Sequence, residues 1–90
     1  MNKLEQARMI INEVDREMAV LWERRMQAVR QVVEYKMEHQ LPIFDGAREK
    51  EVIERNASLI QDDELTSYYV ETLQMMMEIS KKYQREIMER

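Results

Sequence analysis

Two basic residues, Arg25 and Lys36, lie eleven positions apart in a segment rich in helix-forming residues. In a helix this spacing is close to three whole turns, so both side chains point the same way, about 16 Å apart along the axis. Trp22, Val29 and Val32 are expected on that same face. Cations on an apolar face are costly unless an anion meets them. The pattern therefore indicates a site for a small anion, with pairing to the protein's own carboxylates or contact with water as the alternative.

Polar pairs at helical spacing recur in two later segments. Asp45 and Glu49 are four positions apart and share a helix face, although capping and ordinary first-turn charge are the alternative for both. Ser80 and Gln84 are also four apart, on a stripe where core residues are expected. Buried polar groups need partners, so these two are candidates for a site. A peripheral stripe in contact with water is the alternative.

Arg8 lies beside an apolar seam, but far from the other two cations. In one helix it is roughly 25 Å from Arg25 and a quarter turn away, so it cannot share a small pocket with Arg25 and Lys36 of its own chain. An antiparallel partner helix would bring it there. The alternative is a surface arginine paired with Glu5 or Asn12.

The composition favours an all-α fold and excludes several functional classes. One Gly, one Pro and no Cys leave too few turn residues for a β-rich fold and no thiolate for a disulfide or metal site. No metal-ligand pair, glycine-rich phosphate loop or Ser/His/Asp set is present, so no metal and no cofactor are expected. The net charge of −4, with both signs interspersed, argues against a nucleic-acid partner. No segment suits a membrane span or a signal peptide, so we expect a cytoplasmic protein.

Three helices are expected, because the chain has only two breaks. The only Pro and the only Gly fall between His39 and Gly46, where Pro42 disfavours helix at the preceding residue and Asp45 can cap a new helix. A weaker break lies at 60–64, where acidic residues suit a helix start. Ninety residues make one domain at most, so we expect a single domain over 1–90. The expected helices span residues 3–39, 46–59 and 64–88.

The length of the first helix indicates a dimer. It would be roughly 55 Å long, whereas a compact domain of this size is only about 30 Å across. Apolar residues follow one another three and four apart along its first half and form a heptad-like seam. A second copy related by a two-fold axis would cover this seam, and a lone three-helix bundle with protruding ends is the alternative. The seam residues are Leu4, Ala7, Ile11, Val14, Met18 and Leu21.

Five segments in this order and at this spacing also carry a family resemblance that covers nearly the whole chain. They are 5–15 (EQARMIINEVD), 23–25 (ERR), 34–36 (EYK), 41–49 (LPIFDGARE) and 80–84 (SKKYQ). Each is weak alone, but together they are specific, and the chain resembles the all-helical chorismate mutase family. The resemblance implies an intertwined six-helix homodimer with antiparallel first helices and two equivalent sites. It also implies the cofactor-free [3,3] rearrangement of chorismate to prephenate.

The resemblance further implies roles for the polar residues on the first helix. Arg25 would bind one carboxylate of the dianionic substrate, and Arg8 would reach in from the partner chain to bind the other. Lys36 and Gln84 would donate hydrogen bonds to the ether oxygen of the breaking bond.

The remaining implied roles fall on the second and third helices. Asp45, Glu49 and Ser80 would meet the ring hydroxyl, and Arg48 would help to bind the substrate and order the site.

The chain departs from the family pattern at three places. Gln40 stands where a Gly is usual, Asp45-Gly46 stands where a pair such as Asp-Pro is common, and Trp22 replaces an aliphatic residue. Two other functions stay open. One is an isochorismate pyruvate-lyase of the same fold, which Gln84 and the Asp45/Glu49 pair favour less than a mutase. The other is a non-catalytic helical dimerisation or regulatory module, which the polar residues in register on all three helices disfavour.

Overall fold

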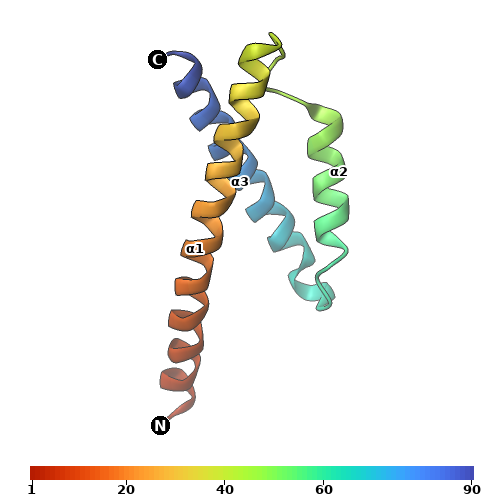
Figure 1. Cartoon of the computed structure of the whole chain (residues 1–90). Helices are drawn as coiled ribbons and strands as arrows, with labels where there is room; N and C mark the ends of the chain where they lie inside the picture. The colour runs from red at the N-terminus through yellow and green to blue at the C-terminus, as the bar shows by residue number, and fades with distance from the viewer.

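The computed structural model describes all 90 residues and contains three helices and no strands. The prediction of an all-α fold with three helices is confirmed. The first helix ends one residue before its expected end and the second ends two before, whereas the third begins one residue earlier than expected. The helices are α1 (Lys3–Glu38), α2 (Gly46–Ala57) and α3 (Asp63–Met88), shown in Figure 1.

Each helix begins at a side-chain cap. The residue before the helix is Asn or Asp, and its side-chain oxygen accepts a hydrogen bond from a backbone amide of the first turn, which otherwise has no partner. These caps explain why the helix starts follow closely from the sequence. The donor and acceptor residues are Glu5 and Asn2 (2.8 Å), Arg48 and Asp45 (3.1 Å), and Glu64 and Asp62 (3.0 Å).

The end of α1 is a Schellman turn. The amide of Leu41 donates to the carbonyl of Lys36 at 2.8 Å, and the amide of Gln40 donates to that of Met37 at 3.4 Å. Gln40 has a φ of 55°, in the left-handed region that favours glycine. The following Pro42 cannot continue the helix, so the chain turns here towards α2.

Helix α3 packs against both other helices, whereas α1 and α2 do not pack against each other. Figure 1 shows α3 crossing the C-terminal half of α1, with α2 beside α3. Helix α3 is therefore the element that connects the other two helices by packing. Five residues are buried, one on α1 and four on α3: Val33, Leu73, Met77, Ser80 and Gln84. Two of the five, Ser80 and Gln84, are polar.

The N-terminal half of α1 extends beyond the other two helices (Figure 1) and leaves its apolar seam exposed. The radius of gyration is 16.4 Å, compared with about 12 Å for a compact chain of this length. The accessible surface is 7585 Å², compared with roughly 5,600 Å² for a compact monomer of this mass. One chain therefore leaves apolar surface uncovered along much of α1.

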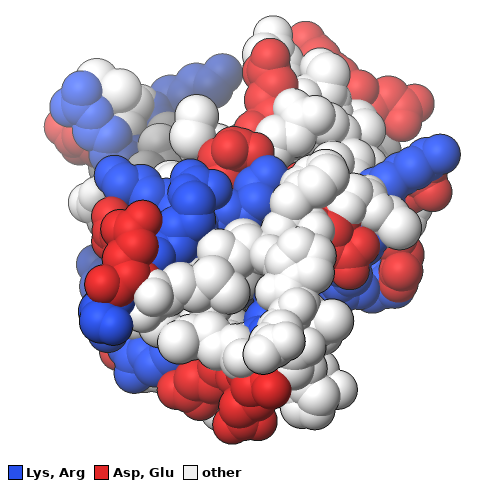
Figure 2. Space-filling view, turned by 90° about the horizontal axis from the view of Figure 1, so that it is seen from above, with Lys and Arg blue, Asp and Glu red and all other residues white.

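The charged surface and the helix lengths add two observations. Seen from above (Figure 2), basic and acidic side chains are interspersed with uncharged ones, so neither sign covers this face. None of the three helices combines the length and the apolar character that crossing a membrane requires.

Candidate active site

A cavity of about 380 Å³ lies between the C-terminal half of α1, α2 and α3. This volume is in the usual range for small-molecule sites. Three helices and the α1–α2 loop contribute its walls, so residues up to 59 positions apart in the chain meet here. Seven of the eight predicted site residues line it, namely Arg25, Lys36, Asp45, Arg48, Glu49, Ser80 and Gln84.

Ser80 connects the floor of the cavity to Arg25. The Arg25 Nη1 donates to Ser80 Oγ at 2.7 Å, and Ser80 Oγ in turn donates to the carbonyl of Met76 at 2.8 Å. Only 6% of Ser80 is exposed, so it occupies a core position and not the peripheral, water-facing position that was the alternative. The two hydrogen bonds fix the orientation of the hydroxyl and hold the guanidinium at the cavity wall.

Gln84 lies one helical turn beyond Ser80 and is equally buried, with 6% exposed. Its Oε1 has no hydrogen-bond partner within the protein. A buried acceptor without a partner is costly, and such groups are rare in folded proteins. Gln84 is therefore a buried amide beside the cavity whose oxygen has no hydrogen-bond donor within the chain.

Lys36 is held at the cavity by the loop that follows α1. Its Nζ donates to the carbonyl of Ile43 at 2.7 Å. An ammonium has three donors, so two are left for a ligand. The expected juxtaposition of Lys36 and Arg25 on one cavity wall is present.

The carboxylates of the cavity belong to α2 and its cap. Asp45 caps α2, as its position predicted. The Glu49 Oε2 pairs with Lys81 Nζ of α3 at 3.1 Å, and the same ammonium pairs with Glu78 Oε1 at 2.8 Å. The hydrogen bonds to Glu78 and then Glu49 raise the pKa of Lys81, and the hydrogen bond from Lys81 lowers the pKa of Glu78.

Three polar residues that line the cavity were missed in the sequence. They are Lys81 of α3 and Arg55 and Asn56 of α2, none of which was predicted as a site residue. Arg55 pairs with Glu51, which lies one turn before it on α2. The position of Arg55 could have been predicted from its spacing, because it is seven positions, or nearly two helical turns, after Arg48 and so lies on the same face of α2.

The cavity is rich in positive charge although the chain has a net charge of −4. Five cations and two carboxylates line it, so a dianion entering it meets a favourable local field. Arg48 pairs with Glu51 at 3.4 Å and remains largely exposed at the rim. The cations are Arg25, Lys36, Arg48, Arg55 and Lys81.

Arg8 does not lie at this cavity. It is exposed on the N-terminal half of α1, and the structure shows no ion pair between it and Glu5. One chain alone thus brings together all the predicted site residues except this arginine.

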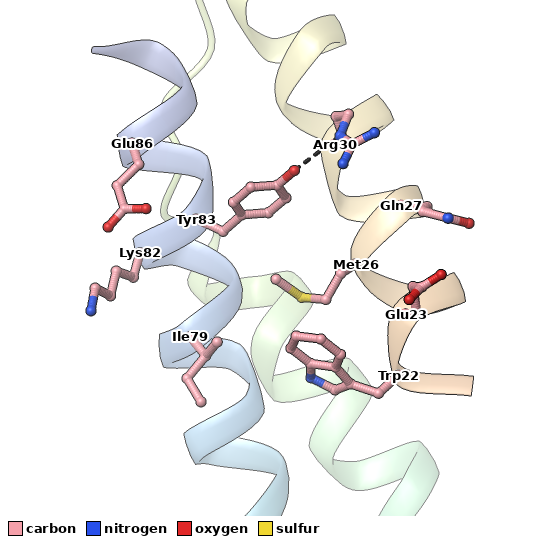
Figure 3. Close-up of a pocket in the computed structure, with 9 residues that line it drawn as sticks. All are labelled: Trp22, Glu23, Met26, Gln27, Arg30, Ile79, Lys82, Tyr83 and Glu86. Carbon is pink, nitrogen blue, oxygen red and sulfur yellow. Dashed lines mark hydrogen bonds between the residues drawn. The ribbon is translucent and has the colours of Figure 1, made fainter. Parts of the chain in front are cut away.

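A second, larger groove of about 590 Å³ lies on the other side of the α1–α3 contact. Figure 3 shows Trp22 and Met26 of α1 and Ile79 and Tyr83 of α3 pointing into it, with Arg30 Nε donating to the Tyr83 hydroxyl at 2.9 Å. Its two cations are matched by two carboxylates, so it offers no excess charge for an anion.

This groove corrects the expected position of Trp22. Trp22 was expected on the face of Arg25 and Lys36, but it lines the opposite groove. Trp22 and Arg25 are three positions apart, which is about 60° short of a full helical turn. Helix α3 crosses α1 between these two side-chain directions, so the two residues line opposite grooves.

The comparison with known families agrees with this geometry. A family model described as chorismate mutase type II matches residues 7–85, a range that includes all eight predicted site residues. No curated protein and no solved structure matches the chain. On the family match, which covers most of its length, the chain belongs to the chorismate mutase type II family.

Proposed function

We propose that the protein rearranges chorismate to prephenate in the cavity between α1, α2 and α3. The observation that carries this proposal is the gathering of seven residues from all three helices around one positively charged cavity in a chain of this family. A one-substrate rearrangement requires no nucleophile and no group transfer. It requires binding, orientation and stabilisation of charge, which fixed cations and amides supply.

The first contribution is selection of the reactive conformer. Chorismate is a flexible dianion whose compact, chair-like form brings the reacting carbons together. Arg25 binds one carboxylate from the cavity wall, and the partner's Arg8 binds the other. Because Ser80 already orients the Arg25 guanidinium, little freedom is lost when the carboxylate arrives.

The second contribution is stabilisation of the transition state. Negative charge builds on the ether oxygen as the carbon–oxygen bond breaks. The Lys36 ammonium and the Gln84 amide donate to that oxygen, and this interaction is stronger in the transition state than in the ground state. A millionfold acceleration corresponds to about 8 kcal/mol in total, and one well-placed donor supplies about 3 to 4 kcal/mol of it.

The remaining residues orient the ring. Asp45, Glu49 and Ser80 meet the ring hydroxyl, and their oxygens lie on the α2 and α3 sides of the cavity. Arg48 at the rim helps to bind the dianion and to order the site. These roles place recognition of the ring hydroxyl on α3, α2 and the cap of α2, recognition of one carboxylate on α1, and the bond-breaking chemistry between α1 and α3.

The proposal includes a homodimer in which α1 pairs antiparallel with its copy. The excess accessible surface of about 2,000 Å² is more than the roughly 800 Å² that each partner buries in a standard interface. A two-fold axis near Met18 would place the partner's Arg8 opposite Val29, between Arg25 and Lys36. This register uses the exposed seam of α1 as the interface and completes the cavity with the missing cation.

The test is conversion of chorismate by the purified protein, with identification of the product beside a parallel assay with isochorismate. Prephenate from chorismate is the expected result. Pyruvate release from isochorismate, without conversion of chorismate, would instead assign the lyase function. If a folded helical protein converts neither substrate, the non-catalytic helical module is the better account.

A further inference from the structure

Lys81 forms ion pairs with carboxylates of two helices, α2 and α3. It follows Ser80 on α3, and its side chain is 14% exposed. Its ammonium pairs with Glu49 of α2 at 3.1 Å and with Glu78 of α3 at 2.8 Å. It also lies 5.1 Å from the centre of the Phe44 ring, in the loop between α1 and α2, within the range of a cation–π contact.

The pair between Lys81 and Glu49 is the only ion pair that joins two different helices of the chain. Helix α2 contacts α3 but not α1, so the position of its first turn depends on α3 and on the loop. Glu49 lies in that first turn and lines the cavity. The placement of its carboxylate therefore depends directly on Lys81.

We propose that Lys81 is a positioning residue that holds the Glu49 carboxylate in the active site and offsets its charge when a dianion binds. This inference rests on the proposed function. Lys81 is not a free cation for the substrate, because two carboxylates already share its ammonium. Glu78 completes the arrangement by holding the ammonium from the same helix, three residues before it.

The charge balance explains why the protein needs this lysine. Glu49 faces a cavity that receives a dianion, and an unpaired carboxylate there would repel it. With Lys81 in place, the carboxylate is paired and still has a second oxygen for the ring hydroxyl. Without Lys81, the Glu49 carboxylate would lose the ion pair that holds it at the cavity, and substrate binding and turnover would both be weakened.

The experiment compares Lys81→Met with Lys82→Met, a matched control on the neighbouring, exposed lysine, which has no ion pair in the structure. We expect Lys81→Met to lower kcat/KM by about tenfold or more, the effect of one charge-assisted hydrogen bond, and Lys82→Met to change it by less than about twofold. Lys81→Arg should restore most of the loss, because it keeps a cation within reach of both carboxylates.

A double-mutant cycle with Glu49→Gln separates positioning from other roles. If Lys81 acts through Glu49, Lys81→Met should lower kcat/KM by less than about twofold in the Glu49→Gln protein. The full loss in that background would overturn the inference, as would a Lys81→Met protein that is less heat-stable but has unchanged kcat and KM. If the wild-type protein fails to convert chorismate, the proposed function and this inference are both overturned. If the wild-type protein is active and the Lys81→Met and Lys82→Met proteins have equal kcat/KM, this inference alone is overturned.

Discussion

At the scale of single residues, the proposed binding groups are held in place before any substrate contact. Ser80 orients Arg25, and the carbonyl of Ile43 orients Lys36. Each bond restricts a long, flexible side chain that would otherwise lose rotamer freedom on binding. The cations therefore lose most of their side-chain entropy when the chain folds, so less is lost when the substrate binds.

Lys36 gives the sharpest test of the proposed chemistry. Lys36→Ala removes the ammonium assigned to the ether oxygen, so we expect kcat to fall by about 10²- to 10³-fold. The variant also loses its bond to the loop, so helical content should be measured by circular dichroism beside steady-state kinetics. Lys50→Ala, on the exposed side of α2, is the control and should keep normal activity. Near-normal turnover by a folded Lys36→Ala protein would remove Lys36 from the mechanism.

The pair of Glu78 and Lys81 predicts how stability depends on pH. The pKa of Glu78 is lowered by its hydrogen bond with Lys81, so its contribution is present above its ordinary pKa and is lost as pH falls through the lowered value. The pKa of Lys81 is raised, chiefly by Glu78, so its contribution is present below its ordinary pKa and is lost as pH rises through the raised value.

Glu78→Gln should therefore lower the thermal midpoint most near neutral pH. The difference from wild type should shrink below about pH 4 and above about pH 11, where one member of the pair loses its charge. Thermal unfolding of both proteins across this range measures it. A difference that stays constant over the whole range would show that the pair does not contribute through its charges.

The sequence was sufficient to predict those residues of the cavity whose pattern is local. Arg25 and Lys36 share a helix face through their spacing alone, and Ser80 and Gln84 interrupt an apolar stripe. Lys81 could not be found in this way. Its pairing with Glu49 becomes visible only when α2 is placed against α3, and its spacing from Glu78 is that of an ordinary pair within one helix.

At the scale of helices, the starts and stops were predictable because they are set by short-range chemistry. Asp45 and Asp62 cap their helices through amides two or three residues later, and Pro42 ends any continuation of α1. The crossing of α1 and α3 was not predictable from either helix alone. That crossing decides which groove each side chain enters, and it explains why Trp22 lies opposite Arg25.

The Schellman turn at the end of α1 offers a stabilising substitution. Gln40 adopts a φ of 55°, which costs a side-chain-bearing residue more than glycine. Gln40→Gly removes this cost, but glycine also has more conformational freedom in the unfolded chain, which offsets part of the effect. We therefore expect Gln40→Gly to raise the free energy of unfolding by about 0.5 to 1 kcal/mol. Chemical denaturation measures it. Gln61→Gly, in the other interhelical turn and without a positive φ, should instead destabilise, and equal effects of the two variants would contradict this argument.

At the scale of the whole molecule, the form of the chain and the proposed chemistry lead to the same requirement. The seam on the N-terminal half of α1 is exposed, and the proposed mechanism assigns the second substrate carboxylate to Arg8, which lies outside the cavity of its own chain. The proposed antiparallel pairing of α1 with its copy would cover the seam and bring Arg8 to the partner's cavity. A dimer formed in this way would have no complete site in either chain alone, so assembly and activity would be coupled.

Mixing two inactive variants tests this coupling. Arg8→Ala and Arg25→Ala should each abolish most activity as homodimers, because every site then lacks one carboxylate-binding arginine. In a mixed dimer, one site combines the intact Arg25 of the first chain with the intact Arg8 of the second, and the other site carries both lesions. Random exchange at equal concentrations makes half of the dimers mixed, so about one quarter of the wild-type sites should be restored.

The recovery should appear only after the chains exchange, for example after joint unfolding and refolding, and native mass spectrometry of differently tagged chains can count the mixed dimers. Activity that rises in proportion to that count would establish that Arg8 acts across the interface. Two further controls are a mixture of Arg25→Ala with Lys36→Ala, whose lesions lie in the same chain's half of the site and cannot complement each other, and each variant refolded alone. If mixed dimers form in the expected amount and activity stays at the level of these controls, Arg8 does not complete the partner's site, and the second carboxylate must be bound by a cation already at the cavity, such as Arg48 or Arg55.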